Sequence, residues 1–263
     1  MFVVNWFLAP FQYDFMQHAF LAGTLAAMLT SLVGFFVVIR QLGFAAHALG
    51  HIGFAGACGA FLLGWPPLVG QLAISLAAGG VMSGIGKRLH ERDTIIGVTL
   101  AFALGLGVLF LHFYHAHGSQ MNSILFGDLL GVATSALYWM GALTVLGILS
   151  LACIARPLWF ASLAPALAEA KSVSLSGLSI LFFILMATAI TLASQVVGIL
   201  LVFTLVVGPP AIALRWTRTF WAGIFTSLLL SLGIVWCAIY LAYYLDWPIS
   251  FWISALVFGL YFV

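Results

Sequence analysis

Apolar runs of helix length follow one another through almost the whole chain of 263 residues, and only short loops separate them. Charged residues make up 5% of the chain, whereas soluble domains carry roughly 25%. The runs also lack the strict alternation of apolar and polar residues that the strands of an outer-membrane barrel need. A backbone inside a bilayer must satisfy its own hydrogen bonds, so the sequence predicts an all-α polytopic membrane protein.

We expect about eight or nine transmembrane helices in a single domain that covers residues 1–263, because no polar linker divides the chain. The first residues lack a basic region and a small-residue cleavage site, so no cleaved signal peptide is expected. The expected spans are 15–39, 42–63, 67–86, 94–113, 131–155, 174–193, 196–214, 220–244 and 249–263, with ends uncertain by about 2–4 residues.

The basic residues predict how these spans are oriented. All eight lie on the same side of the alternating spans: Arg40, Lys87, Arg88, Arg92, Arg156, Lys171, Arg215 and Arg218. Lys and Arg favour cytoplasmic loops, so the N-terminus is expected outside and the C-terminus in the cytoplasm. The charges only punctuate loops, and the net charge of +2 gives no reason to expect a nucleic acid partner.

Two histidines stand out inside the second apolar run. His47 and His51 are four residues apart, which places them on one face of a helix, one turn from each other. Two imidazoles so placed can hold one transition-metal ion, and ionisable groups at membrane depth are costly enough to indicate function. The competing interpretation is a pair of buried, hydrogen-bonded structural histidines. A complete metal site needs further ligands or water.

Two weaker metal candidates lie on the expected outer side. His112, His115 and His117 form a cluster that can gather metal, although a short polar loop with interfacial aromatics is the favoured explanation. Asp128 follows Phe126-Gly127, where a turn or helix cap competes with a role in lining a path.

The cytoplasmic loop after the fifth span predicts a short helix. Pro157 is expected to break the fifth helix. After it, Pro165 suits the first turn of a helix, and the Ala, Leu, Glu and Lys residues that follow are good helix formers. A loop helix lying on the membrane surface is the alternative. The residues singled out here are Ser162, Pro165, Leu167, Ala168, Glu169 and Lys171.

Five groups of residues, taken in chain order, share a pattern with one known family. They are Arg40–Phe44 with His47–His51, Asp93–Gly97, Leu125–Gly131, Val197–Val202 with Pro209–Ala211, and Tyr243–Pro248. This ordered set resembles the zinc/manganese/iron permease family of bacterial ABC transporters. One departure matters, because the family commonly has Asp where this chain has His47.

The resemblance implies an ABC importer permease fold in the bacterial cytoplasmic (inner) membrane, with His47 and His51 as metal contacts along the transport path. It implies a homodimer, two copies of an ATP-binding subunit, and an extracytoplasmic metal-binding protein. It also makes residues 162–173 a coupling helix that meets the ATP-binding subunit. No permanently bound cofactor is expected. Imidazole suits zinc better than carboxylate does, so zinc is favoured over manganese or iron as the transported divalent metal.

The chain itself is not expected to be an enzyme. It has no Gly-x-x-x-x-Gly-Lys-Ser/Thr motif, so a partner must hydrolyse ATP. Intramembrane proteolysis through Ser83 is disfavoured, because no Gly-x-Ser-x-Gly turn is present. A proton-coupled secondary metal transporter that uses the same histidines is the stronger alternative.

Overall fold

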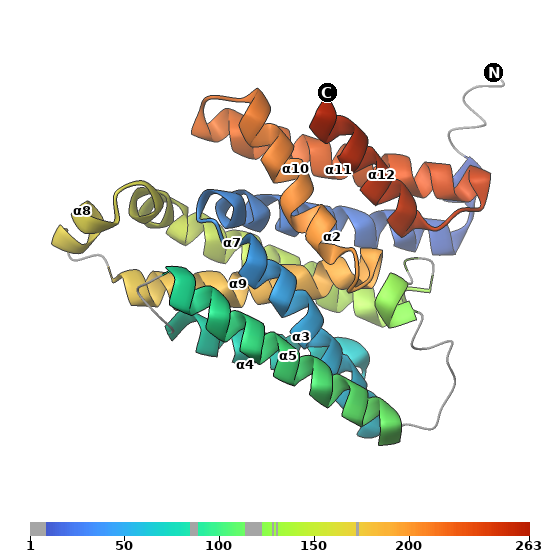
Figure 1. The fold of residues 1–263 in the computed structure, drawn as a ribbon. Coiled ribbons are helices and arrows are strands. Elements are labelled where there is room, and N and C mark those ends of the chain that lie inside the picture. The colour runs from blue at the N-terminus through green and yellow to red at the C-terminus, as the bar shows by residue number, and fades with distance from the viewer. Residues whose placement is uncertain (1–8, 85–88, 114–122, 128, 130, 172–173) are drawn as a thin grey trace.

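A computed structural model describes residues 9–84, 89–113, 123–127, 129, 131–171 and 174–263, and the described part of the chain is built from helices (Figure 1). The helices are η1 (Ala9–Gln12), α2 (Asp14–Ile39), α3 (Gly43–Leu62), α4 (Pro67–Gly84), α5 (Leu89–Phe113), α7 (Thr134–Leu163), α8 (Pro165–Ala170), α9 (Leu175–Val197), α10 (Val202–Trp216), α11 (Phe220–Leu245) and α12 (Ile249–Phe262).

Each expected span corresponds to one of these helices, but the helices differ in length. Six are long and apolar enough to cross a membrane, namely those within α2, α3, α5, α7, α9 and α11. The apolar helices α4, α10 and α12 are shorter. At 1.5 Å per residue, α10 is about 22 Å long, less than the ~30 Å hydrocarbon core. The all-helical class is confirmed, and the count of eight or nine spans stays a prediction.

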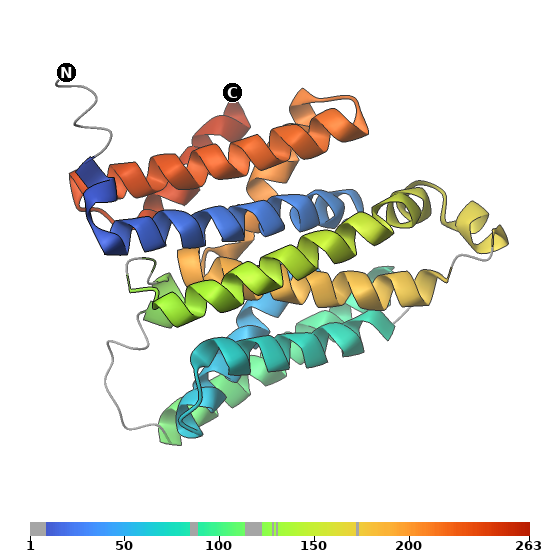
Figure 2. The ribbon, with the colours of Figure 1, turned by 180° about the vertical axis from the view of Figure 1, so that it is seen from behind.

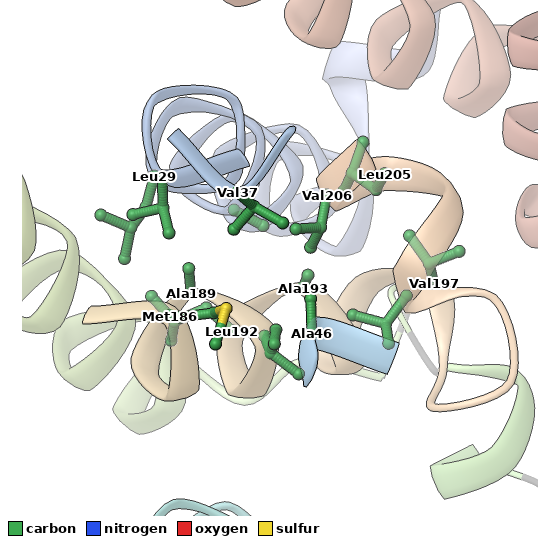
Figure 3. Packing of buried hydrophobic residues seen from close by; sticks show 14 of the residues in the cluster. Leu29, Val37, Ala46, Met186, Ala189, Leu192, Ala193, Val197, Leu205 and Val206 are labelled. Atoms are coloured by element: carbon green, nitrogen blue, oxygen red, sulfur yellow. The ribbon is translucent and has the colours of Figure 1, made fainter. Parts of the chain in front are cut away.

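Helix α9 lies at the centre of the bundle. Its most apolar window is 78% buried, against 17% for α5 and 22% for α7. Figure 3 shows why: Met186 and Ala189 of α9 point towards Leu29 and Val37 of α2. On either side of this centre, α4 and α5 lie with α3, whereas α11 and α12 lie with α10 (Figures 1 and 2). The apolar side chains that α5 and α7 leave exposed suit contact with lipid.

A sharp break separates α9 from α10. Gly198 follows α9 with a φ of +81°, and Gly127 has a φ of +82°; such values favour glycine. The two glycines lie against each other, and a Cβ at Gly127 would come within 2.7 Å of the Gly198 nitrogen. The Ile199 and Leu200 amides donate hydrogen bonds to the Ile124 and Leu125 carbonyls, at 3.2 and 3.3 Å. We call this paired backbone, residues 124–127 and 198–200, the clip.

The expectation that Pro157 ends the fifth helix is wrong. Pro157 lies inside α7, which continues to Leu163. The helix stops instead at Ala164, whose φ of −141° and ψ of 71° leave the helical region. The reason is the following Pro165, because a residue before proline is pushed out of the α conformation. Pro165 then begins α8, where a missing amide hydrogen costs little.

Candidate metal site on α3

The two histidines lie in the first half of α3, on one face as expected. A tight turn after α2 sets the start of α3: Gln41 has a φ of 53°, and the Leu42 amide donates to the Val37 carbonyl at 2.9 Å. The ring centroids of His47 and His51 are 4.6 Å apart, with the ring planes at 75°. Both side chains are half-buried. The arrangement brings two imidazoles to one exposed spot within reach of a common ion.

The beginning of α10 lies next to the histidine pair. The His47 ring meets the Phe203 ring edge-on, with centroids 5.5 Å apart. One turn along α3, Gly50 allows a close approach, because a Cβ there would lie 2.8 Å from the Val202 Cγ1. Since α10 begins at Val202, the break at Gly198 is what brings the first turn of α10 against α3. The sequence motifs around His47 and Gly198 are thus neighbours in space.

The pair supplies only part of a metal site. Within the described residues, no group of three or more His, Cys, Asp and Glu side chains could hold a metal ion. Zinc usually takes four ligands, and a transport or catalytic site keeps some of them exchangeable. Two histidine nitrogens therefore leave positions for water or for groups from outside this chain.

Of the other metal candidates, only His112 lies in the described part of the chain, and it forms no metal-binding group with the pair. His112 is exposed in the last turn of α5 and lies against Phe113, with ring centroids 5.6 Å apart. His115, His117 and Asp128 lie outside the described residues. Gly127, next to Asp128, belongs to the clip, so the motif that suggested Asp128 has a structural role of its own.

The candidate coupling segment is shorter than residues 162–173. Ser162 belongs to the last turn of α7, and the separate helix α8 covers Pro165–Ala170. Residues 172–173 and the Glu169 side chain lie outside the described part. Leu167 is 61% exposed, whereas Ala168 is fully buried against its own chain. The Lys171 ammonium lies 5.6 Å from the centre of the Phe160 ring. Figure 1 shows α8 projecting from one end of the bundle.

Sequence analysis missed a polar contact between α4 and α9. Gln71 is 1% exposed, and its amide nitrogen donates a short hydrogen bond to the Ser194 hydroxyl. The Gln195 amide nitrogen lies 3.4 Å from the Gln71 amide oxygen. The available signal was a glutamine within one apolar run and a Ser-Gln pair at the end of another. Such residues are costly in lipid unless they find each other.

Comparisons with known proteins agree with this architecture. A sequence model described as "ABC 3 transport family" matches residues 12–263. The manganese import system permease protein ScaB of Streptococcus parasanguinis is 26% identical over 212 residues, which are 80% of this chain and 75% of ScaB. The high-affinity zinc uptake system membrane protein ZnuB of Haemophilus influenzae is 25% identical over 234 residues, which are 87% of this chain and 90% of ZnuB.

The fold also matches a solved structure. A chain in the structure of PsaBC from Streptococcus pneumoniae, in complex with Fab, superposes with a TM-score of 0.88. The superposition covers 99% of this chain and 94% of that one, at 20% sequence identity. At this identity the likeness establishes the fold alone.

Proposed function

Since the chain belongs to the ABC 3 transport family, as its sequence motifs indicated, we propose that it is the permease subunit of an ATP-driven importer of divalent transition-metal ions. Zinc is the favoured cargo, and manganese or iron are the alternatives. The observation that carries this proposal is the half-buried pair of imidazoles, His47 and His51, on the face of α3 that looks towards the start of α10. In this role the metal is a transported substrate and not a resident cofactor.

The preference for zinc rests on the ligand at position 47. The names of the relatives divide between manganese import and zinc uptake, so family membership leaves the metal open. A second imidazole in place of a carboxylate makes the site softer, which suits zinc and other late divalent ions.

A homodimer would complete the site. One chain offers two nitrogen ligands, and a twofold axis beside the pair would add the same two from a second copy. An open apolar groove between α10 and α12 is lined by Thr204, Phe251, Ser254, Val257 and Phe258, and Thr204 directly follows Phe203, which contacts His47. A second copy that packs against this surface would bury it and bring the two histidine pairs together.

The remaining partners follow from the same proposal. An ATP-binding subunit, in two copies, would contact α8, whose exposed Leu167 offers an apolar contact at the end of the bundle. An extracytoplasmic metal-binding protein would deliver the ion to the opposite end. ATP binding and hydrolysis would then move α8 and open the path to one side at a time.

The proposed orientation has the N-terminus outside and the C-terminus in the cytoplasm of a bacterium with this protein in its inner membrane. It is supported by the common side of all eight basic residues. Exposed aromatic side chains near both ends of the bundle, such as Trp139 and Trp221, suit the two membrane interfaces. Side-specific labelling of an engineered thiol, as in the experiment below, tests this orientation as well.

The decisive experiment replaces His47 and His51 together with Ala. Uptake of zinc into vesicles that contain the permease and its ATP-binding subunit should fall by more than about tenfold, because even outer-shell partners of metal ligands are worth 10–100-fold. Folding and association with the ATP-binding subunit should be retained. His112→Ala is the matched control, since that histidine is exposed and apart from the pair.

Unchanged uptake kinetics in the double variant would show that His47 and His51 are not metal contacts.

The same vesicles distinguish ATP-driven transport from proton-coupled transport. Uptake should require ATP on the side of the membrane that carries the ATP-binding subunit. It should continue when the proton gradient is collapsed.

A further inference from the structure

A band of polar side chains crosses the apolar interior between α4 and α9. It consists of Gln71 and Ser75 on α4, and Thr191, Ser194 and Gln195 on α9, and we call it the polar seam. Gln71 donates to the Ser194 hydroxyl, and Ser194 donates to the Thr191 carbonyl at 2.8 Å. The seam lies behind α3: Gly53 contacts it, and Gly53 is rotated by about 200° around the helix from His51. The seam is therefore separate from the proposed metal site.

Two hydroxyls of the polar seam have no hydrogen-bond partner in the described structure. The oxygens of Ser75 and Thr191 are both buried, and both side chains are fully enclosed. They also belong to the same contact. Gln71 contacts Ser194, and Gly79 contacts Phe183, so α4 and α9 run in opposite directions. Ser75 lies halfway between Gln71 and Gly79. It therefore lies beside the part of α9 between Phe183 and Ser194, which includes Thr191. Thr191 shares the face of Ser194 and Gln195, which follow it by three and four residues.

A cavity opens at one end of the seam. It has a volume of ≈ 210 Å³ and is lined by Gln71, Ser123, Ser194 and Gln195 together with Phe61 and Pro67. These residues belong to the end of the bundle that the proposed orientation makes external. A cavity holds a water once roughly 10–15 Å³ is accessible, and a water needs two to four polar partners. This cavity meets both conditions, with room for several waters.

We infer that this cavity is a water-filled inlet that brings solvent from the outer face along Gln71 to the hydroxyls of Ser75 and Thr191. Water supplies the donors and acceptors that these hydroxyls lack, because lipid and the apolar core offer none. The cargo metal is not the proposed occupant, since the described residues that line the cavity include no imidazole, carboxylate or thiolate. The inlet hydrates the contact between α3, α4 and α9. A dry apolar contact in its place would hold the three helices more rigidly against one another.

The test uses thiols as reporters of water. In a chain whose three native cysteines are replaced by Ala, Ser75→Cys and Thr191→Cys are made singly. Each is treated with a membrane-impermeant methanethiosulfonate added to the outer side of oriented vesicles. A thiol reacts as thiolate, which forms in water and not in an apolar core. The matched control is Ala193→Cys, because Ala193 lies at a similar depth on α9 but points towards the apolar Val206 of α10 (Figure 3).

We expect Cys at 75 and 191 to react at least about tenfold faster than Cys at 193, because burial in apolar surroundings suppresses the thiolate. Adding Gln71→Leu, which replaces the polar mouth by an apolar plug, should return the rate at position 191 to that of the control. Equal rates at 191 and 193 would overturn the inlet, as would reaction only from the cytoplasmic side. Because the two reporters sit on different helices, a folding defect in one leaves the other to decide. The outcome does not depend on metal transport.

Discussion

The two faces of α3 differ in how completely this chain covers them. One face carries Gly53 and Gly56 and is closed by α4. A Cβ at Gly53 would come within 2.8 Å of the Ser75 hydroxyl, and one at Gly56 would clash with the Gly70 carbonyl oxygen. The other face carries His47 and His51, which are both half-buried, and the Phe203 ring lies against the His47 ring. The glycine face is thus finished within the chain, whereas the histidine face is half-open.

The glycine face of α3 holds the helix in place, whereas the histidine face presents side chains that this chain leaves partly uncovered. Small residues let helix backbones touch, which is how helices associate where lipid removes the hydrophobic driving force. Histidines in the same position would prevent that contact. Because its glycine face does the packing, α3 holds the imidazoles of His47 and His51 at a fixed height and rotation, and leaves them available for the proposed metal contact.

The same contrast recurs on α8. Ala168 is buried against the rest of the chain, while its neighbour Leu167 is 61% exposed. A bulky residue at 168 would therefore disturb this chain first, and a change at 167 would act on a partner. The predictions that follow set covered faces against open ones.

The largest effect is expected from Gly56→Ala on the covered face of α3. The new methyl group would meet the Gly70 carbonyl, which belongs to a helix backbone and cannot turn aside. Overpacking of this kind costs about 1–3 kcal/mol and occasionally more. We expect a lower melting temperature and less monodisperse protein in detergent. Gly105→Ala is the control, because open space surrounds Gly105 and alanine favours a helix. Equal melting temperatures for the two variants would show that α3 and α4 are not in backbone contact.

A smaller effect is expected from Leu167→Ser on the open face of α8. Losing one apolar side chain from a contact with the ATP-binding subunit should weaken association by roughly 1–2 kcal/mol, or about tenfold. The variant should still melt like the parent chain, since most of the Leu167 side chain is exposed in this subunit. Co-purification of the ATP-binding subunit measures the effect. Leu63→Ser is matched in exposure, at 67%, but lies at the other end of the bundle. If both variants retain the subunit equally, α8 is not the docking element.

An effect of similar size, on metal preference and not on stability or association, is expected from His47→Asp on the open face of α3. A carboxylate keeps a ligand but hardens it, so transport should persist while the preference for manganese over zinc rises by about tenfold, or ~1.4 kcal/mol. Competition between the two metals for uptake measures the ratio. His112→Asp adds the same charge away from the pair and should leave the ratio unchanged. An identical metal profile for His47→Asp and the parent chain would mean that position 47 does not set selectivity.

The sequence predicted the helices and the histidine pair because both depend on local spacing. Long apolar runs define spans such as α2, and a separation of four residues puts His47 and His51 together in any α-helix. It did not predict that α9 ends at Val197 or that Gly127 lies against Gly198, because backbone pairing between distant segments leaves no periodic signal. Pro157 misled for a related reason, since neighbouring helices can support a proline inside a membrane helix. The polar seam depends on the register between α4 and α9, which single runs do not encode.

The clip has a mechanical consequence for the segment that connects its two parts, which contains α7, α8 and α9. Helix α7 begins and helix α9 ends within a few residues of the clip, and α8 lies between their far ends. Helices α7 and α9 are about 45 Å and 35 Å long, and the hydrogen bonds of the clip join the chain just before α7 to the chain just after α9. A push on α8 cannot be absorbed by letting α7 and α9 slide past each other. In the proposed mechanism, such a push would be passed to the clip, where Leu200 leads directly into α10, whose Phe203 contacts His47.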